Sequence, residues 1–181
     1  MDNFRSKKKV KIIVASAFAV IVVVGIVFFY HRDSSFSLGT VHQAIVQRFD
    51  NVEHISADEF SKFNTEDVVV FDVRQGEEFR VSHIDGAIHV SPELSVEAFW
   101  DQFSERIKDK TLVFYCSVGW RSSEFGDSLK RVYPQSPIYN LEGGLFKWVN
   151  EQRSLVGNGI HPYDAVWGQL IEDQSIIRYK N

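Results

Sequence analysis

Cys116 is the only cysteine in this 181-residue chain, and its position makes it the first candidate for chemistry. It ends the apolar run 112–115 and is followed by a loop that contains Gly119 and Arg121. An apolar run, a glycine-bearing loop and a helical segment predict a strand, a tight turn and a helix N-terminus. Backbone N–H groups and the helix dipole at such a junction favour the thiolate, which is the nucleophilic form. The pattern therefore predicts a reactive cysteine, although a lone cysteine is often only an inert buried side chain.

The residues after Cys116 have the types needed for an anion-binding concavity. Gly119 can adopt a positive φ, which lets successive N–H groups turn inward. Arg121 could offer a fork of donors to an oxyanion, or it could pair with an acid. Ser122 and Ser123 suit the N-cap or first turn of the helix that we expect at residues 122–132.

The elements that must position this loop alternate between strands and helices. Strands are predicted at residues 68–73, 87–90, 112–115 and 138–141. Helices are predicted at residues 39–51, after the capping-box serine Ser56, around 77–81, from Ser95 to Ile107, at 122–132 and at 145–149. This alternation implies an α/β fold with a largely parallel sheet. Ligand sites in such sheets lie beyond the carboxyl ends of the strands, where Cys116 stands.

Three segments together carry a further signal. They are Phe71–Arg74 with Glu78 and Ser82–Ala87, then Cys116–Arg121, and finally Asn140–Trp148. In this order they resemble the motifs of the single-domain rhodanese-like sulfurtransferase family, over about residues 54–153. Ser82 and Asp85 are departures, since the family usually has Gly and Pro there. The resemblance implies a three-layer α/β domain with a central parallel sheet.

The resemblance also implies an activity, namely two-step transfer of sulfane sulfur. Cys116 would attack a donor such as thiosulfate, become a persulfide and pass the outer sulfur to a thiol or to cyanide, without a cofactor. The residues implied to bind substrate are Ser117, Val118, Gly119, Trp120, Arg121 and Ser122. Those implied to be structural are Asp72, Arg74, Glu78, His83, Gly86, Gly143 and Gly144. We expect Asp72 and Arg74 to form an ion-pair network with Glu78, and Gly143 and Gly144 to serve a turn.

Three alternative functions remain open at this point. The related dual-specificity phosphatases carry C-x5-R, whereas only four residues separate Cys116 from Arg121, which favours sulfur over phosphate chemistry. A tethered rhodanese-like module could bind a partner with little turnover, and Trp120 could serve it or simply pack on the surface. A thiol that reacts with oxidants or with partner disulfides in an oxidising compartment is the third alternative.

Residues 12–30 are apolar and uncharged, and as a helix they would span about 28 Å, close to the bilayer core. Basic residues precede this segment and are scarce after it, which predicts a cytoplasmic N-terminus and an exported body. The lipid bilayer is therefore an expected partner. A signal peptide cleaved near Ser35–Ser37 is the alternative.

The charge distribution and the remaining segments bound the other possibilities. Residues 1–11 carry five basic side chains and one acidic side chain, a net charge of +4. Because the whole chain has a net charge of −4, residues 12–181 have a net charge of −8. An acidic body argues against a nucleic-acid partner, and the scattered histidines give no metal-site spacing. The predicted organisation is a basic stub at 1–11, a transmembrane helix at 12–30, a linker and helix at 31–53, the domain at 54–153 and a C-terminal extension at 154–181 that packs on the domain.

Overall fold

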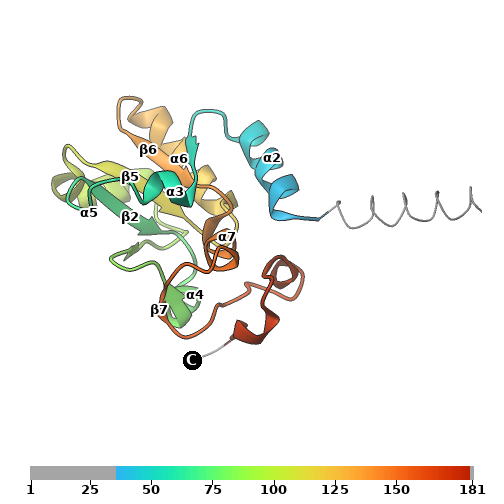
Figure 1. Ribbon diagram of the computed structural model, residues 1–181. Helices are drawn as coiled ribbons and strands as arrows, with labels where there is room; N and C mark the ends of the chain where they lie inside the picture. Colours follow the sequence, from blue (N-terminus) through green and yellow to red (C-terminus); the bar gives the residue numbers. More distant parts are fainter. Residues whose placement is uncertain (1–35, 180–181) are drawn as a thin grey trace, which may run out of the picture. The chain divides into compact units, whose positions relative to one another are not determined.

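The computed structural model describes residues 36–179, which form an α/β domain around a parallel sheet (Figure 1). The strand order is β1-β6-β5-β2-β4, and every neighbouring pair is parallel. The strands are β1 Glu53–Ile55, β2 Val68–Asp72, β4 Ile88–His89, β5 Thr111–Tyr115 and β6 Ile138–Leu141. The predicted parallel sheet is confirmed. The short edge strand β1 is absent from the sequence prediction, because three residues with one apolar side chain give no periodic signal.

The central strand β5 is apolar because both of its faces are covered. It pairs with β2 over five residues and with β6 over three. Val113, Phe114 and Tyr115 have no exposed surface. A strand buried on both faces reads as a continuous hydrophobic run, and this is why the sequence located it correctly.

One face of the sheet is covered by α2 Leu38–Arg48, α5 Val96–Ile107 and α6 Trp120–Val132. Phe71 and Phe114 of the sheet lie with their ring centroids 5.1 Å apart, and Phe99 of α5 meets Phe71 edge to face at 5.0 Å. Ile45 of α2 is also completely buried in this cluster. The domain is predicted to begin at residue 54, whereas in the structure the preceding helix contributes to the same core.

The other face is covered by α3 Ala57–Phe60, α7 Gly144–Asn150 and the C-terminal segment. In that segment β7 Val156–Gly157 pairs antiparallel with β3 Ser82–His83. The segment continues through the two 3₁₀ turns η1 Trp167–Leu170 and η2 Gln174–Ile176, and it buries Ile160 and Ile171 against the domain. With helices on both faces of the sheet, the domain has three layers.

The helices α3 and α5 begin at the predicted capping residues, whereas α6 begins earlier than predicted. The capping box of Ser56 and Glu59 is present, and Ser95 accepts from the backbone N–H of Ala98. The prediction that α6 begins at residue 122 is wrong. Its N-cap is Gly119, with φ 98°, because a left-handed glycine turns the chain into the helix two residues earlier. The remaining helix, α4 Gly76–Val81, lies in the connection from β2 to β4.

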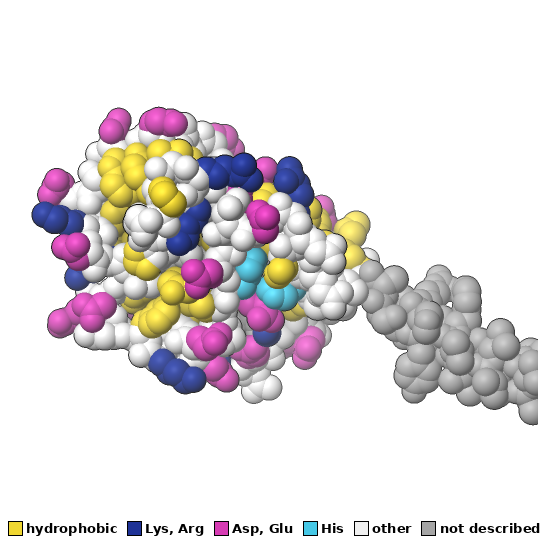
Figure 2. Space-filling view, turned by 90° about the horizontal axis from the view of Figure 1, so that it is seen from above, with side chains coloured by type: hydrophobic (Ala, Val, Ile, Leu, Met, Phe, Trp, Pro, Cys, Tyr) yellow, Lys and Arg dark blue, Asp and Glu magenta, His cyan; other side chains and the backbone are white. Residues whose placement is uncertain are grey.

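The predicted membrane segment, residues 12–30, lies outside the described residues. From residue 36 to residue 179, no helix has the length and apolar character to cross a bilayer. On the face in Figure 2, acidic and basic side chains are interspersed around hydrophobic patches and form no continuous basic surface.

The ion pair between Asp72 and Arg74 yields a stability prediction, because neither side chain has any exposed surface. Asp72→Ala leaves the Arg74 guanidinium buried without its counter-ion, so we expect a loss of about 3–5 kcal/mol in the free energy of unfolding. The matched control is Asp58→Ala, whose carboxylate is exposed and pairs with Arg153 at the surface. We expect it to cost less than about 1 kcal/mol. Urea unfolding curves of both variants measure this, and equal losses would contradict it.

Candidate active site

Cys116 stands directly beyond the carboxyl end of β5, in a loop that leads into α6. The residue is 1% exposed, and its Sγ accepts a hydrogen bond from the backbone N–H of Gly119 at 3.2 Å. Gly119 has a positive φ of 98°, a conformation that glycine can adopt without strain. The N–H donor and the start of α6 both place positive charge at the sulfur, an arrangement that stabilises a thiolate.

The N-terminus of α7 is hydrogen-bonded to the start of the Cys116 loop. The backbone N–H of Leu145 donates to the Cys116 carbonyl at 2.8 Å, and that of Phe146 donates to the Ser117 carbonyl at 2.9 Å. Because a trans peptide points its C=O and N–H in opposite directions, these bonds turn the following loop N–H groups away from α7. Such a close approach requires Gly144, where a Cβ would lie 2.4 Å from the Cys116 carbonyl oxygen.

Gly143 and Gly144 both have positive φ, as expected for the turn predicted there. Gly144 has the additional role of letting α7 approach the cysteine loop.

Arg121 is bound to an acid instead of pointing free into the pocket. Its Nη1 donates to Glu78 Oε2 at 2.7 Å, and its Nη2 donates to Glu78 Oε1 at 2.9 Å. Ser117 completes the group, since its hydroxyl donates to Glu78 Oε1 at 2.8 Å and accepts from Arg121 Nη2 at 3.0 Å. Of the two roles considered for Arg121, the structure therefore shows the pairing with an acid.

The expected network of Asp72, Arg74 and Glu78 is only partly correct. Asp72 and Arg74 pair with each other, and Arg74 also donates to the Ser82 carbonyl. Glu78 pairs with Arg121, 43 residues further along the chain. Sequence distance could not reveal this partner, because the β2–β4 connection meets the cysteine loop only in the folded domain.

Both members of the Glu78–Arg121 pair are charged in the folded state. Burial acts to raise the pKa of Glu78, but the hydrogen bonds and charge of Arg121, together with those from Gln75 and Ser117, outweigh it and lower the pKa. Burial acts to lower the pKa of Arg121, but the Glu78 carboxylate and Cys116 outweigh it and raise the pKa. The pair is therefore a fixed ionic support of the loop at neutral pH.

Three other residues predicted to belong to the site, Ser122, His83 and Gly86, do not line the pocket. Ser122 is fully buried in the first turn of α6. His83 stacks on the Phe79 ring, with centroids 4.0 Å apart, and its Nδ1 lies 3.0 Å from the Phe79 carbonyl oxygen. Gly86 occupies a turn at φ 74°. His83 and Gly86 support the fold beside the site and do not line the pocket.

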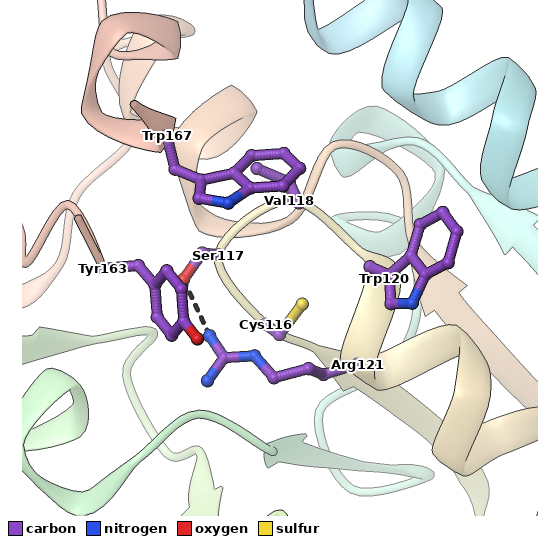
Figure 3. Close-up of a pocket in the computed structure, with 7 residues that line it drawn as sticks. All are labelled: Cys116, Ser117, Val118, Trp120, Arg121, Tyr163 and Trp167. Carbon is purple, nitrogen blue, oxygen red and sulfur yellow. Dashed lines mark hydrogen bonds between the residues drawn. The ribbon is translucent and has the colours of Figure 1, made fainter. Parts of the chain in front are cut away.

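A pocket of about 170 Å³ opens above the cysteine (Figure 3). Its lining residues are Cys116, Ser117, Val118, Trp120, Arg121, Tyr163 and Trp167. Figure 3 shows Tyr163 and Trp167 of the C-terminal segment on one side of the sulfur and Trp120 on the other. Trp120 both lines the pocket and packs edge to face on Phe49 of the core, with centroids 5.4 Å apart. In the part of the chain from 36 to 179, no group of three His, Cys, Asp or Glu side chains could hold a metal ion.

Tyr163 and Trp167 line the pocket although the sequence gives no sign of it. The tail's aromatic content predicted packing, but nothing in the spacing of residues 161–170 pointed to Cys116. The contact depends on the path of the C-terminal segment across the second face of the sheet.

The close approach at Gly144 can be tested against a matched glycine. Gly144→Ala and Gly86→Ala both place a Cβ at positive φ, which costs about 1–2 kcal/mol in either case. A Cβ at Gly86 meets nothing within 4 Å, whereas at Gly144 it collides with the Cys116 carbonyl. We therefore expect Gly144→Ala to lose a further 1–3 kcal/mol or so. It should also change the rate of Cys116 alkylation by iodoacetamide, a rate that Gly86→Ala leaves unaltered. Identical behaviour of the two variants would show that α7 does not hold the loop.

Comparisons with known proteins agree with this geometry. The family model of the rhodanese-like domain matches residues 56–151. Uncharacterized protein YibN of Escherichia coli is 31% identical over 93 residues, which are 51% of this chain and 64% of YibN. The tRNA uridine(34) hydroxylase of Erwinia tasmaniensis is 30% identical over 93 residues, 48% of this chain and 25% of the hydroxylase. The chain thus matches less than two thirds of the length of either relative.

A solved structure from Rhodopseudomonas palustris, described as a protein of unknown function and possible tyrosine phosphatase, shares the fold. It has a TM-score of 0.51 and 24% identity, and the match covers 63% of this chain and 92% of that one. The family model covers more than half of the present sequence and includes both the Cys116 loop and the segment around Gly144. The chain belongs to the rhodanese-like domain family.

Proposed function

We propose that this protein is a sulfurtransferase that carries sulfane sulfur as a persulfide on Cys116. The observation that carries the proposal is the position of the Cys116 sulfur. Cys116 Sγ lines the pocket, accepts the Gly119 N–H at 3.2 Å and stands at the start of α6. A thiolate in that position can attack a donor without a separate general base, since the charge is already stabilised by fixed dipoles.

The reaction consists of two displacements at sulfur. The Cys116 thiolate attacks the outer sulfur of thiosulfate, the bond between the two sulfurs of the donor breaks, and sulfite leaves with the electron pair. The outer sulfur remains on Cys116 as a persulfide anion. An acceptor thiolate or cyanide then attacks that sulfur, and the Cys116 thiolate leaves.

The length of the loop and the pairing of Arg121 favour sulfur over phosphate chemistry. Only four residues separate Cys116 from Arg121, and both terminal nitrogens of Arg121 donate to Glu78. A phosphatase would need such donors for the oxygens of its phosphoryl group. The possible phosphatase among the solved structures is similar in fold alone.

A tethered binding module with little turnover is the second candidate. The observation in its favour is the exposure of aromatic side chains at the mouth of the pocket, with Trp120 39% and Tyr163 51% exposed. Exposed aromatic side chains beside a cleft are common at protein interaction sites.

We further propose that residues 12–30 anchor the protein in a membrane, with the N-terminus in the cytoplasm and the rhodanese-like domain on the other side. The support is the sequence itself, an uncharged apolar run preceded by five basic side chains. The persulfide chemistry would then take place outside the cytoplasm, with the acceptor thiol supplied by another molecule.

Mass spectrometry of the intact protein tests the persulfide. After incubation of the full chain with thiosulfate, we expect a gain of about 32 Da that cyanide removes and that Cys116→Ala never acquires. If the wild-type protein stays unmodified with thiosulfate and with polysulfide, it is not a sulfurtransferase and the binding module becomes the better explanation.

Cell fractionation tests the anchor. We expect the full chain to stay with the membranes through an alkaline carbonate wash, because an apolar span of this length inserts stably. A variant without residues 1–35 should be released into the soluble fraction. Recovery of the natural protein as a soluble chain that begins after Ser37 would show that the segment is a cleaved signal.

A further inference from the structure

The C-terminal segment presents two aromatic side chains to the pocket from one small folded unit. The Asp164 carboxylate accepts the backbone N–H groups of Val166 and Trp167 at 2.8 and 2.9 Å. Gly168 packs closely on Pro162, where an added Cβ would lie 2.9 Å from the proline Cβ. Trp167 is thereby held at the pocket by its own local hydrogen bonds and packing.

Tyr163 is held there at a conformational cost. Its φ is 67°, a region that bulky side chains rarely adopt, and its backbone N–H donates to His161 Nδ1 at 3.1 Å. The side chain is 51% exposed, so burial of the ring does not account for the strain. Strain of this kind is retained where the surroundings impose it, and it often marks functional positions. Here it brings the Tyr163 ring over the Arg121 guanidinium, with 5.1 Å from Cζ to the ring centroid.

The positive charge of Arg121, on the side of the pocket where Tyr163 lies, is largely neutralised. Both terminal nitrogens of Arg121 donate to the Glu78 carboxylate, and the Tyr163 ring lies over the guanidinium. An inorganic dianion such as thiosulfate therefore meets a neutral ion pair and not an open cation. Beyond Cys116 and Ser117, the other side chains that line the pocket are hydrophobic, namely Val118, Trp120 and Trp167.

The size of the pocket suits a small apolar group. Its volume is about 170 Å³, and an apolar cavity of about 150 Å³ is enough to hold benzene. A ring or alkyl group placed between Tyr163, Trp167 and Trp120 would bury apolar surface on binding, a gain that thiosulfate cannot make.

We propose that Tyr163 and Trp167 are specificity-determining residues, which select sulfane-sulfur donors bearing an apolar organic group over inorganic thiosulfate. This inference rests on the proposed sulfurtransferase function. With benzenethiosulfonate as the probe, the Cys116 thiolate attacks the terminal sulfur, the bond between the two sulfurs breaks and benzenesulfinate leaves with the electron pair. The product is the same Cys116 persulfide, but the two donors differ in charge and leaving group as well as in the organic group that the pocket must hold.

The test compares kcat/KM for benzenethiosulfonate, methanethiosulfonate and thiosulfate, with cyanide as the acceptor, in the full-length protein. Both thiosulfonates release a sulfinate, so their ratio reports on recognition of the ring more than on leaving-group chemistry. We expect the benzene-to-methane ratio to fall roughly tenfold in Trp167→Ala and in Tyr163→Gly, chiefly through a higher KM for the aromatic donor. Tyr163→Gly also relieves the strained backbone, so its thermal unfolding midpoint should not fall.

Val166→Ala is the matched control, because Val166 is 58% exposed in the same segment and does not line the pocket. It should leave the ratio as in the wild type. If the ratio is unchanged in both aromatic variants while thiosulfate still forms the persulfide, the specificity inference is overturned and the sulfurtransferase function stands. If no donor forms a persulfide on Cys116, the proposed function fails and the inference fails with it.

Discussion

The rest of the site depends on two backbone hydrogen bonds, those from Leu145 and Phe146 of α7 to the carbonyls of Cys116 and Ser117. They fix the orientation of the first two peptide planes of the loop, and so decide to which side the N–H groups of Ser117 and Val118 point. They are possible because Gly144 has no Cβ to strike the Cys116 carbonyl. The cysteine loop and the closing glycine motif, 28 residues apart in sequence, are therefore a single structural unit.

The second support is the ionic group of Glu78, Arg121 and Ser117. It joins the helix between β2 and β4 to both ends of the cysteine loop, and most of it is removed from solvent. A buried carboxylate is costly unless it is fully paired, and here it has three side-chain or backbone partners. Arg121 is held by this pairing beside Cys116, and the backbone N–H of Gly119 donates directly to the sulfur.

The C-terminal segment changes the character of the pocket. Without this segment, the sulfur would be exposed to solvent in the Cys116 loop, beside the Glu78–Arg121 ion pair. With Tyr163 and Trp167 in place, the sulfur lies in an open pocket of about 170 Å³ whose walls are mostly hydrophobic. The segment is held by β7, by the burial of Ile160 and Ile171, and by its own short-range hydrogen bonds. The same contacts that hold the segment against the domain also bring its aromatic side chains to the pocket beside Cys116.

The sequence by itself determined the features that depend on neighbours along the chain. The central strands, the helices capped by Ser56 and Ser95, and the place of Cys116 at a strand-to-helix junction all follow from short-range patterns. Only the tertiary structure decided the partner of Glu78, the second role of Gly144 and the presence of Tyr163 and Trp167 at the pocket. Each of these joins residues more than twenty positions apart, and the choice among possible partners is made by how the elements pack, which leaves no periodicity in the sequence.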